Sequence, residues 1–263
     1  MTILITGGGG LVGGTLLRLL HAAGHDVRVA SRNPDRLSPP EGVPVVRCDL
    51  SDPGTFPAAL DGITSVFLYA DPSHTAAFAG RAAEAGVGHI VLLSSSATLF
   101  PEPDSGRPNP ITGLHLETER ALKASPVRST LLRPGAFASN ALSWSHSIRT
   151  TGTVRLPYPD THDAPIHEAD IAEVALAALA GPLPADDDNH LTGPASLTFR
   201  EQIEHIAQAT GRPIALDVVS EEAWKEETAP YIPAPVADTL VSWWREHDGV
   251  PAATTRTVEW LTG

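Results

Sequence analysis

A doubly wound, mostly parallel α/β sheet is the fold class that this sequence predicts, and three observations lead to it. A short β-branched segment at residues 2–6 runs directly into a glycine-rich turn. Apolar residues then recur at helical spacing until Gly24, and a second strand follows at 27–30. Further short strands rich in Val, Ile and Leu alternate with helical or turn segments. Strands and helices in this rhythm form a parallel sheet that is covered on both faces.

The later strands of this sheet are expected at 43–47, 65–70, 89–93 and 129–133. Between the fourth and fifth strands, Asp71 and Pro72 are typical of an N-cap and a first helical residue, and Gly86 ends the Ala-rich stretch behind them. We therefore expect a crossover helix between residues 71 and 86.

After residue 135 the pattern loosens. Residues 150–166 are rich in Pro and predict a loop with a short strand at 153–156. Helices are expected at 168–180, after Thr198, and at 236–244; Gly181-Pro182 ends the first, and Thr198 with Glu201 forms a capping box before the second.

The polar segment 182–189 is expected to be exposed and separates two regions. We expect a larger domain at residues 1–181 and a smaller C-terminal region at 182–263.

Composition excludes several classes of protein. Cys48 is the single cysteine, so neither an internal disulfide nor a thiolate zinc cluster is available. The formal charge of −13 disfavours nucleic acid and anionic membranes as partners. No apolar run approaches the ~20 residues that cross a bilayer, and the opening residues lack a basic region and a cleavage site. We expect a soluble, cytoplasmic protein.

The glycine turn carries the clearest chemistry. Gly7, Gly10 and Gly13 fit G-x-x-G-x-x-G directly after a strand and at the start of a helix. Such a turn lets the backbone approach a pyrophosphate, whose charge the helix N-terminus stabilises. A flexible turn without a ligand is the alternative, but the surrounding strand, helix and strand favour nucleotide binding.

The end of the second strand indicates which dinucleotide is bound. An NAD site places an acid there to hold the ribose, whereas this sequence has Ser31, Arg32 and Asn33. Arg32 suits a 2′-phosphate, which favours NADP, although a plain surface arginine is the alternative. Asp49 is placed to accept a hydrogen bond from adenine, or to cap a turn.

Seven blocks carry a family resemblance: TGGGGLVGG at 6–14, ASRNPDRL at 30–37, CDLSD at 48–52, LLSSSA at 92–97, HLETERALKAS at 115–125, LRPGAFASN at 132–140 and APIHEADIAEVA at 164–175. With them the sequence resembles the NmrA-like group of atypical short-chain dehydrogenases, in the NAD(P)-binding Rossmann superfamily. That group includes NADPH-dependent reductases of quinones, dyes and plant phenolics, and regulatory proteins that bind NADP without turning it over.

The resemblance implies that residues at the carboxyl ends of the strands hold the cofactor: Thr6, Gly7, Gly10, Leu11, Val12, Gly13, Ser31, Arg32, Asp49, Leu50, Tyr69, Ala70, Ser94, Pro134, Gly135, Ala136 and Phe137. It also implies a substrate pocket near Phe137, Asn140, Trp144 and His167, although Phe137 and Trp144 are equally explained as core residues. The C-terminal region is expected to close this pocket.

The sequence departs from the wider family at the catalytic pair. Catalytic short-chain dehydrogenases use Tyr-x-x-x-Lys, but here His115 and Glu119 occupy the corresponding helix. His115 is a candidate general acid, and we expect Glu119 to raise its pKa. Alternatively, His115 starts a helix and Glu119 pairs with Lys123.

Two further sites have alternatives. The resemblance makes Ser96 the candidate that orients a substrate carbonyl, while Ser94 faces the cofactor; both serines are also explained as backbone caps at a strand end. The stretch 162–170 is rich in potential ligands, but it lacks a fixed metal-ligand spacing, so we expect no metal.

We therefore expect a reductase that transfers hydride from NADPH to a small carbonyl, quinone or conjugated double bond. A regulatory protein that senses NADP and a non-redox enzyme on the same fold are the alternatives, because fold alone does not determine function. The expected partner is a small-molecule substrate, and a homodimer is left open.

Overall fold

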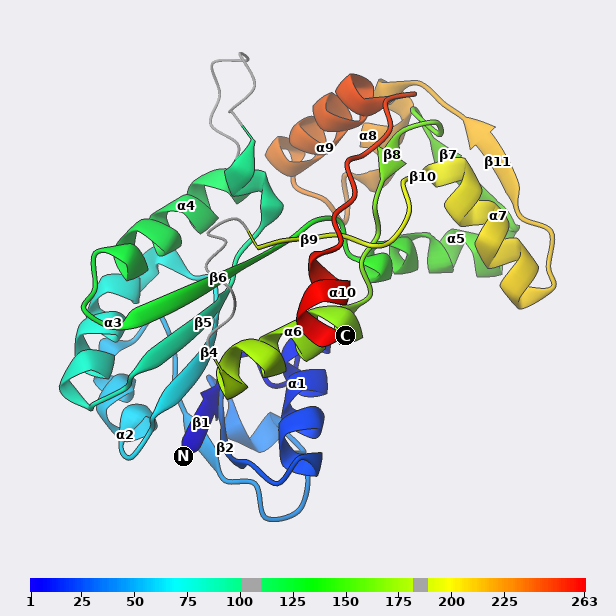
Figure 1. The fold of residues 1–263 in the computed structure, drawn as a ribbon. Coiled ribbons are helices and arrows are strands. Elements are labelled where there is room, and N and C mark those ends of the chain that lie inside the picture. The colour runs from blue at the N-terminus through cyan, green and yellow to red at the C-terminus, as the bar shows by residue number, and fades with distance from the viewer. Residues whose placement is uncertain (101–109, 182–188) are drawn as a thin grey trace. The chain divides into compact units, whose positions relative to one another are not determined.

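The computed structural model describes residues 1–100, 110–181 and 189–263 (Figure 1). Internal contacts divide the chain into two compact units. The sheet unit comprises Met1–Pro134, Glu168–Leu191 and Arg256–Gly263, and the second unit comprises Gly135–His167 and Thr192–Thr255. This division differs from the expected break after residue 181, because distant segments pair with one another inside each unit.

The sheet unit contains the expected parallel sheet. Its strands are β1 (Thr2–Ile5), β2 (Asp26–Ser31), β3 (Val45–Arg47), β4 (Ser65–Tyr69), β5 (His89–Leu93), β6 (Arg128–Pro134) and β9 (His190–Leu191). They are hydrogen-bonded in the order β3-β2-β1-β4-β5-β6-β9, and every neighbouring pair is parallel. The predicted fold class is confirmed, and β9 is a seventh strand that the sequence pattern did not indicate.

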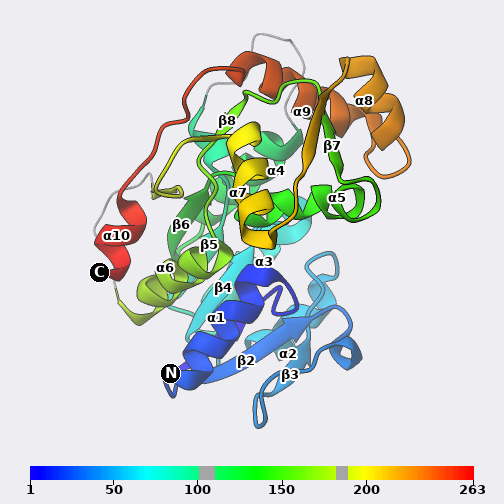
Figure 2. The ribbon, with the colours of Figure 1, turned by 90° about the vertical axis from the view of Figure 1, so that its right-hand side faces the viewer.

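Helices cover both faces of this sheet: α1 (Leu11–Ala22), α2 (Phe56–Leu60), α3 (Thr75–Glu84), α4 (Pro110–Lys123), α6 (Glu168–Ala180) and α10 (Thr257–Thr262). Helices α1 and α6 pack together on one face (Figure 2), and α10 packs against α6. Helices α2, α3 and α4 lie on the other face. No described helix is long and apolar enough to cross a membrane.

Two expected boundaries moved for local reasons. β3 begins at Val45 instead of residue 43, where Pro44 has no N–H to donate to a neighbouring strand. Asp71 caps a 3₁₀ turn, η3 (Pro72–His74), by accepting from the Ser73 N–H at 3.0 Å, and α3 begins only after that turn. The expected exposed segment after Gly181 lies, apart from Asn189, outside the described residues.

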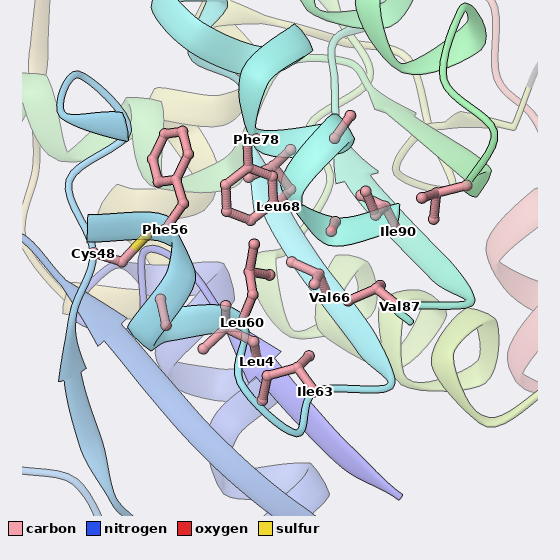
Figure 3. Close-up of a cluster of buried hydrophobic side chains, with 14 of the residues drawn as sticks. Leu4, Cys48, Phe56, Leu60, Ile63, Val66, Leu68, Phe78, Val87 and Ile90 are labelled. Carbon is pink, nitrogen blue, oxygen red and sulfur yellow. The ribbon is translucent and has the colours of Figure 1, made fainter. Parts of the chain in front are cut away.

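A hydrophobic cluster fills the space between the sheet and helices α2 to α4 (Figure 3). Alternate residues of the central strands, among them Leu4, Val66 and Ile90, contribute to it. Phe56 and Phe78 pack edge to face across it, with ring centroids 5.2 Å apart. Because alternate strand residues point to opposite faces, near-continuous apolar strands bury both faces at once.

The strand order reverses between β1 and β4. The chain runs outward from β1 to β2 and β3, then returns to place β4 on the other side of β1. The loops that follow β1 and β4 therefore diverge at the carboxyl edge, and ligands of open α/β sheets bind at such a point.

The second unit contains two short sheets and several helices: α5 (Ser145–Thr151), β7 (Thr153–Leu156), β8 (His162–Asp163), β10 (Leu197–Thr198), α7 (Phe199–Thr210), β11 (Ala215–Val218), α8 (Glu221–Thr228) and α9 (Ala234–His247). β7 pairs with β11 and β8 pairs with β10, so these pairs join chain segments on both sides of α6. The capping box of Thr198 and Glu201 is present at the start of α7.

His89 is a buried imidazole at the start of β5, only 4% exposed. Its Nε2 atom lies 2.9 Å from the Thr130 hydroxyl on β6. Burial, together with the nearby Arg128 charge, lowers the pKa of His89 to about 4. The neutral imidazole is therefore the form that fits the folded sheet.

We expect His89 to make stability depend on pH. The unfolded chain binds the extra proton below about pH 6.5 and the folded chain only near pH 4, so stability is full above 6.5 and falls as pH is lowered. The loss amounts to about 3 kcal/mol. Urea unfolding of wild type and His89→Gln across this range measures it, with exposed His74→Gln as control. Parallel stability curves for wild type and His89→Gln would contradict this assignment.

Candidate functional site

The glycine turn is built on a contact that leaves no room for a side chain. Gly7 adopts a left-handed conformation with φ of +66°, and its carbonyl oxygen accepts from the Gly10 N–H at 2.9 Å. A Cβ atom on Gly13 would lie 2.5 Å from that same oxygen. Gly7 and Gly13 are therefore required by the turn itself, before any ligand is considered.

The start of α1 is the part of the turn that suits a phosphate. Gly10 is the N-cap residue and supplies no side-chain cap. The first-turn N–H groups, including those of Leu11, Val12 and Gly13, have no acceptor within the helix. Together with the helix dipole, these groups fit the diphosphate of a dinucleotide.

The Thr6 side chain is hydrogen-bonded between two strands. Its hydroxyl donates to the Phe67 carbonyl at 3.1 Å and accepts from the Tyr69 N–H at 3.0 Å. Thr6 therefore ties the ends of β1 and β4 together, so its side chain has a structural role at the switch point.

The ends of β2, β3 and β4 bring polar groups together. Arg32 is exposed and forms no ion pair within the described residues. Asp49 accepts from the hydroxyl and N–H of Ser51, and these bonds, with weaker help from Arg32, lower the pKa of its carboxyl. The hydroxyl of Ser31 accepts from the Asn33 N–H. A free guanidinium beside a strand end fits a 2′-phosphate.

Leu50, Tyr69 and Ala70 contact the hydrophobic core. Leu50 is 6% exposed and belongs to the hydrophobic cluster below the sheet edge, and Tyr69 and Ala70 pack against that cluster. Cys48 is buried in the same cluster, where burial raises the pKa of its thiol to about 11. That thiol is therefore unreactive, as expected for a small core residue.

A buried ion pair lies at the ends of β5 and β6. Glu119 on α4 and Arg133 on β6 are both almost fully buried. Arg133 donates from Nε to Oε1 at 2.9 Å and from Nη2 to Oε2 at 2.8 Å. The Ser94 hydroxyl donates to Oε1 at 2.6 Å. The Thr98 hydroxyl lies 3.1 Å from Oε1 and 2.9 Å from the Ser95 carbonyl oxygen, so its single proton is shared between these two acceptors. Four hydrogen bonds therefore converge on one carboxylate.

This arrangement corrects the expected pairing of Glu119. Burial alone would raise its pKa, but Arg133 and Ser94 more than offset that effect, so the pKa of Glu119 lies below its ordinary value. Glu119 pairs with Arg133 and not with Lys123, since the carboxylate is directed into the protein, where a guanidinium meets it bidentately.

Glu119 acts on His115 in the expected direction, but burial outweighs it. Glu119 does favour the charged imidazole, but burial disfavours it more, so the pKa of His115 is lowered overall. The Nδ1 atom of His115 is buried and has no hydrogen-bond partner within the described residues. A buried polar atom without a partner is costly unless a ligand or water satisfies it.

The serines after β5 have different surroundings. Ser94 is 4% exposed, and its hydroxyl is bonded to Glu119, so that side chain is engaged inside the protein. Ser95 caps the 3₁₀ turn η4 (Ser96–Leu99) by accepting from the Ala97 N–H. Ser96 is half-buried, and its hydroxyl is not bonded within the described part of the chain. Of the three serines, Ser96 has the hydroxyl that is available to a ligand.

The expected substrate-pocket residues all belong to the second unit. Trp144 packs edge to face on Phe199, with centroids 5.8 Å apart, as expected for a core residue. Phe137 is half-buried and forms a β-bridge to Ile166, and Asn140 is exposed. The sheet unit ends at Pro134, while Gly135 and Ala136 begin the second unit.

Sequence reasoning missed three polar residues. Arg133 and Thr98 complete the buried cluster, and the LRPG block placed Arg133 at a strand end without indicating its partner. Asp163 on β8 is half-buried, and burial raises the pKa of its carboxyl to about 7. No grouping of three or more His, Cys, Asp or Glu residues that could hold a metal occurs in the described ranges.

Comparison with known proteins agrees with this geometry. A family model described as NAD(P)H-binding matches residues 7–182. A (4-alkanoyl-5-oxo-2,5-dihydrofuran-3-yl)methyl phosphate reductase from Streptomyces griseus is 37% identical, with 99% of this chain and 93% of that protein covered. An NAD(P)H azoreductase from Xenophilus azovorans is 30% identical, with 90% and 84% covered. The Citrobacter triphenylmethane reductase, solved with NADP(H), shares the fold at a TM-score of 0.79 and 20% identity, over 100% and 95% of the chains.

We expect Gly13→Ala to damage the turn itself. The added Cβ would press on the Gly7 carbonyl oxygen, and backbone overpacking of this kind costs about 1–3 kcal/mol. Gly9→Ala is the matched control, since a Cβ there meets only the end of the Leu37 side chain at 3.0 Å. Thermal unfolding and NADPH titration measure both variants. Equal stability and equal affinity for the two variants would show that the contact is not limiting.

Proposed function

Because the chain belongs to the NAD(P)H-binding family, we propose that it is an NADPH-dependent reductase that transfers hydride to a small organic electrophile. The observation that carries this proposal is the free Arg32 guanidinium beside a glycine turn that leaves the α1 N–H groups open. In a chain with a formal charge of −13, an exposed cation that forms no ion pair among the described residues suits a phosphate ligand.

The relatives narrow the class of electrophile. The chemical name of the Streptomyces relative describes an unsaturated lactone that carries an acyl group, and the Xenophilus relative is named for an azo compound. The first compound contains a conjugated carbon–carbon double bond, and an azo compound contains an N=N double bond. We therefore place a conjugated double bond or a quinone ahead of a simple carbonyl as the substrate of this chain.

The residues of the sheet unit supply the proton and the orientation. NADPH, when bound, supplies the hydride that attacks an electrophilic carbon of the substrate. In this proposal Ser96 donates a hydrogen bond to the substrate oxygen that receives the electron pair, and His115 delivers the balancing proton. The unpartnered Nδ1 of His115 is the group that would face that oxygen or a bridging water. Phe137, Asn140 and His167 remain proposed substrate-contacting residues.

A regulatory protein that senses NADP is the second candidate. One observation favours it: Glu119 stands four residues after His115, where the Tyr-x-x-x-Lys pattern of catalytic short-chain dehydrogenases has lysine, and it is engaged by Arg133, Ser94 and Thr98. His115 therefore has no cationic partner of the usual kind. If the protein is such a sensor, it should bind NADPH, but no acceptor should support oxidation of the bound NADPH.

We expect Arg32→Ala to weaken NADPH binding roughly ten- to a hundredfold and NADH binding far less, because only NADPH carries the 2′-phosphate. Calorimetric titration with both cofactors measures the difference. Arg81→Ala, which removes the same charge from a surface pair with Glu84 on α3, is the matched control. Equal affinity of the wild-type protein for NADPH and NADH would contradict the assignment of Arg32 to the 2′-phosphate.

We expect His115→Ala to lower kcat by roughly 10²–10⁴-fold with little change in NADPH affinity, the range for a lost general acid. Because the pKa of His115 is lowered, wild-type kcat should rise as pH falls below about 6.5, and the variant should lose that rise. Stopped-flow NADPH oxidation with a panel of quinones, enones and azo dyes tests both. Unchanged turnover in the variant would mean that Ser96 or solvent supplies the proton. A wild-type protein that turns over no acceptor would favour the regulatory function.

A further inference from the structure

The turn that follows β5 is held on both sides of Ser96 by the same oxygen atom. Ser94 precedes Ser96 and donates its hydroxyl to Glu119 Oε1 at 2.6 Å. Thr98 follows Ser96, and its hydroxyl shares one proton between that oxygen, at 3.1 Å, and the Ser95 carbonyl oxygen, at 2.9 Å. Within the turn, the Ala97 N–H bonds to the Ser95 hydroxyl and the Thr98 N–H to the Ser95 carbonyl. The backbone that carries Ser96 is therefore anchored at two points to α4.

Arg133 keeps the shared oxygen in place. Its guanidinium binds both carboxylate oxygens of Glu119, and both side chains are about 95% buried. The Arg133 N–H in turn donates to the Asn189 carbonyl, which fixes the end of β6. Only an ionised carboxylate offers enough acceptor positions for four donors at once. The carboxylate of Glu119 thereby connects α4 to the ends of β5 and β6 and to the η4 turn.

The hydroxyl of Ser96 is the exception in this network. Ser94 and Thr98 donate their hydroxyl protons inside the protein, and the Ser95 hydroxyl accepts from the Ala97 N–H. Ser96 is half-buried and has no bond within the described residues. Because the neighbouring hydroxyls are hydrogen-bonded within the protein, the turn can hold the Ser96 hydroxyl in a defined position.

We propose that Glu119 is a positioning residue that acts through Ser96: by binding Ser94 and Thr98 it holds the Ser96 hydroxyl at the angle needed to bind the substrate oxygen. This inference rests on the proposed function, which gives Ser96 its contact with substrate. It assigns the residue at the position of the usual catalytic lysine to a different task, since Glu119 touches no substrate atom and transfers no proton.

The test removes one anchor at a time. Thr98→Val replaces the hydroxyl with a methyl group of nearly equal size, and Thr98→Ser restores the hydroxyl. Thr118→Val is the matched control, because Thr118 is a buried threonine on α4 whose hydroxyl bonds to the Leu114 carbonyl and not to Glu119. Each variant is made alone and in a Ser96→Ala background. Glu119→Gln is measured too, but this substitution leaves the buried Arg133 guanidinium without a charged partner, and the variant can fail to fold.

We expect Thr98→Val to lower kcat about three- to tenfold, the effect of losing one hydroxyl proton that Glu119 Oε1 and the Ser95 carbonyl share, with the KM for NADPH unchanged. In the Ser96→Ala background the same substitution should have no further effect on kcat, because the group that it misplaces is absent. Thr98→Ser should recover wild-type kcat, and Thr118→Val should leave it unaltered. Hydrogen exchange at the Ala97 and Thr98 amides should quicken in Thr98→Val and stay unchanged in Thr118→Val.

Two results would overturn the inference in an active enzyme. One is an equal loss of kcat from Thr98→Val with and without Ser96, and the other is unchanged amide exchange in the turn. Failure of the proposed function is recognised separately, as a wild-type protein that turns over no acceptor while exchange in the turn still responds to Thr98→Val. That outcome would remove the catalytic role of Ser96, and with it the role given to Glu119.

Discussion

The contact between the Gly7 carbonyl and the backbone of Gly13 is the constraint on which the site depends. It brings the end of β1 and the first turn of α1 closer than any side chain would allow, with a Cβ on Gly13 only 2.5 Å from the oxygen. Because α1 starts there without a side-chain cap, its N–H groups face the carboxyl edge at the point where the strand order reverses. Thr6 fixes the neighbouring strand end, so the turn and β4 keep a constant spacing.

A second constraint is electrostatic. A buried ion pair is expensive, because two charges lose their water, and it persists only where further hydrogen bonds satisfy both partners. Glu119 and Arg133 meet that condition through Ser94 and Thr98. Some polar groups at this edge of the sheet are hydrogen-bonded within the cluster, and others are left without a hydrogen bond in the described residues. The Ser96 hydroxyl and the Nδ1 atom of His115 are left over, and each is half-buried or buried beside the cluster.

The chemistry proposed for the protein follows from that separation. Catalytic short-chain dehydrogenases place a phenol beside a cation, whereas this chain places an imidazole with a lowered pKa one turn before an engaged carboxylate. An imidazole that must be protonated before it donates, together with a fixed hydroxyl, suits a substrate whose electron pair is spread by conjugation, since less charge then develops on any one oxygen. The free guanidinium of Arg32 belongs to the other end of the dinucleotide, where it acts on affinity and cofactor choice.

The sequence by itself determined the fold class, the parallel strands, the glycine turn and the family, because these depend on local period and on residues that few conformations accept. It placed α6 at Glu168–Ala180 and the capping box at Thr198 correctly, since both signals lie within a few neighbouring residues. Only the tertiary structure decided the partners of Glu119, the net shift in the pKa of His115 and the grouping of residues 135–167 with 192–255. These depend on burial and on contacts between residues far apart in the chain, such as Glu119 with Arg133 and β7 with β11. A periodic pattern indicates which face of an element is apolar, but it does not indicate which charged residue of another element that face contacts.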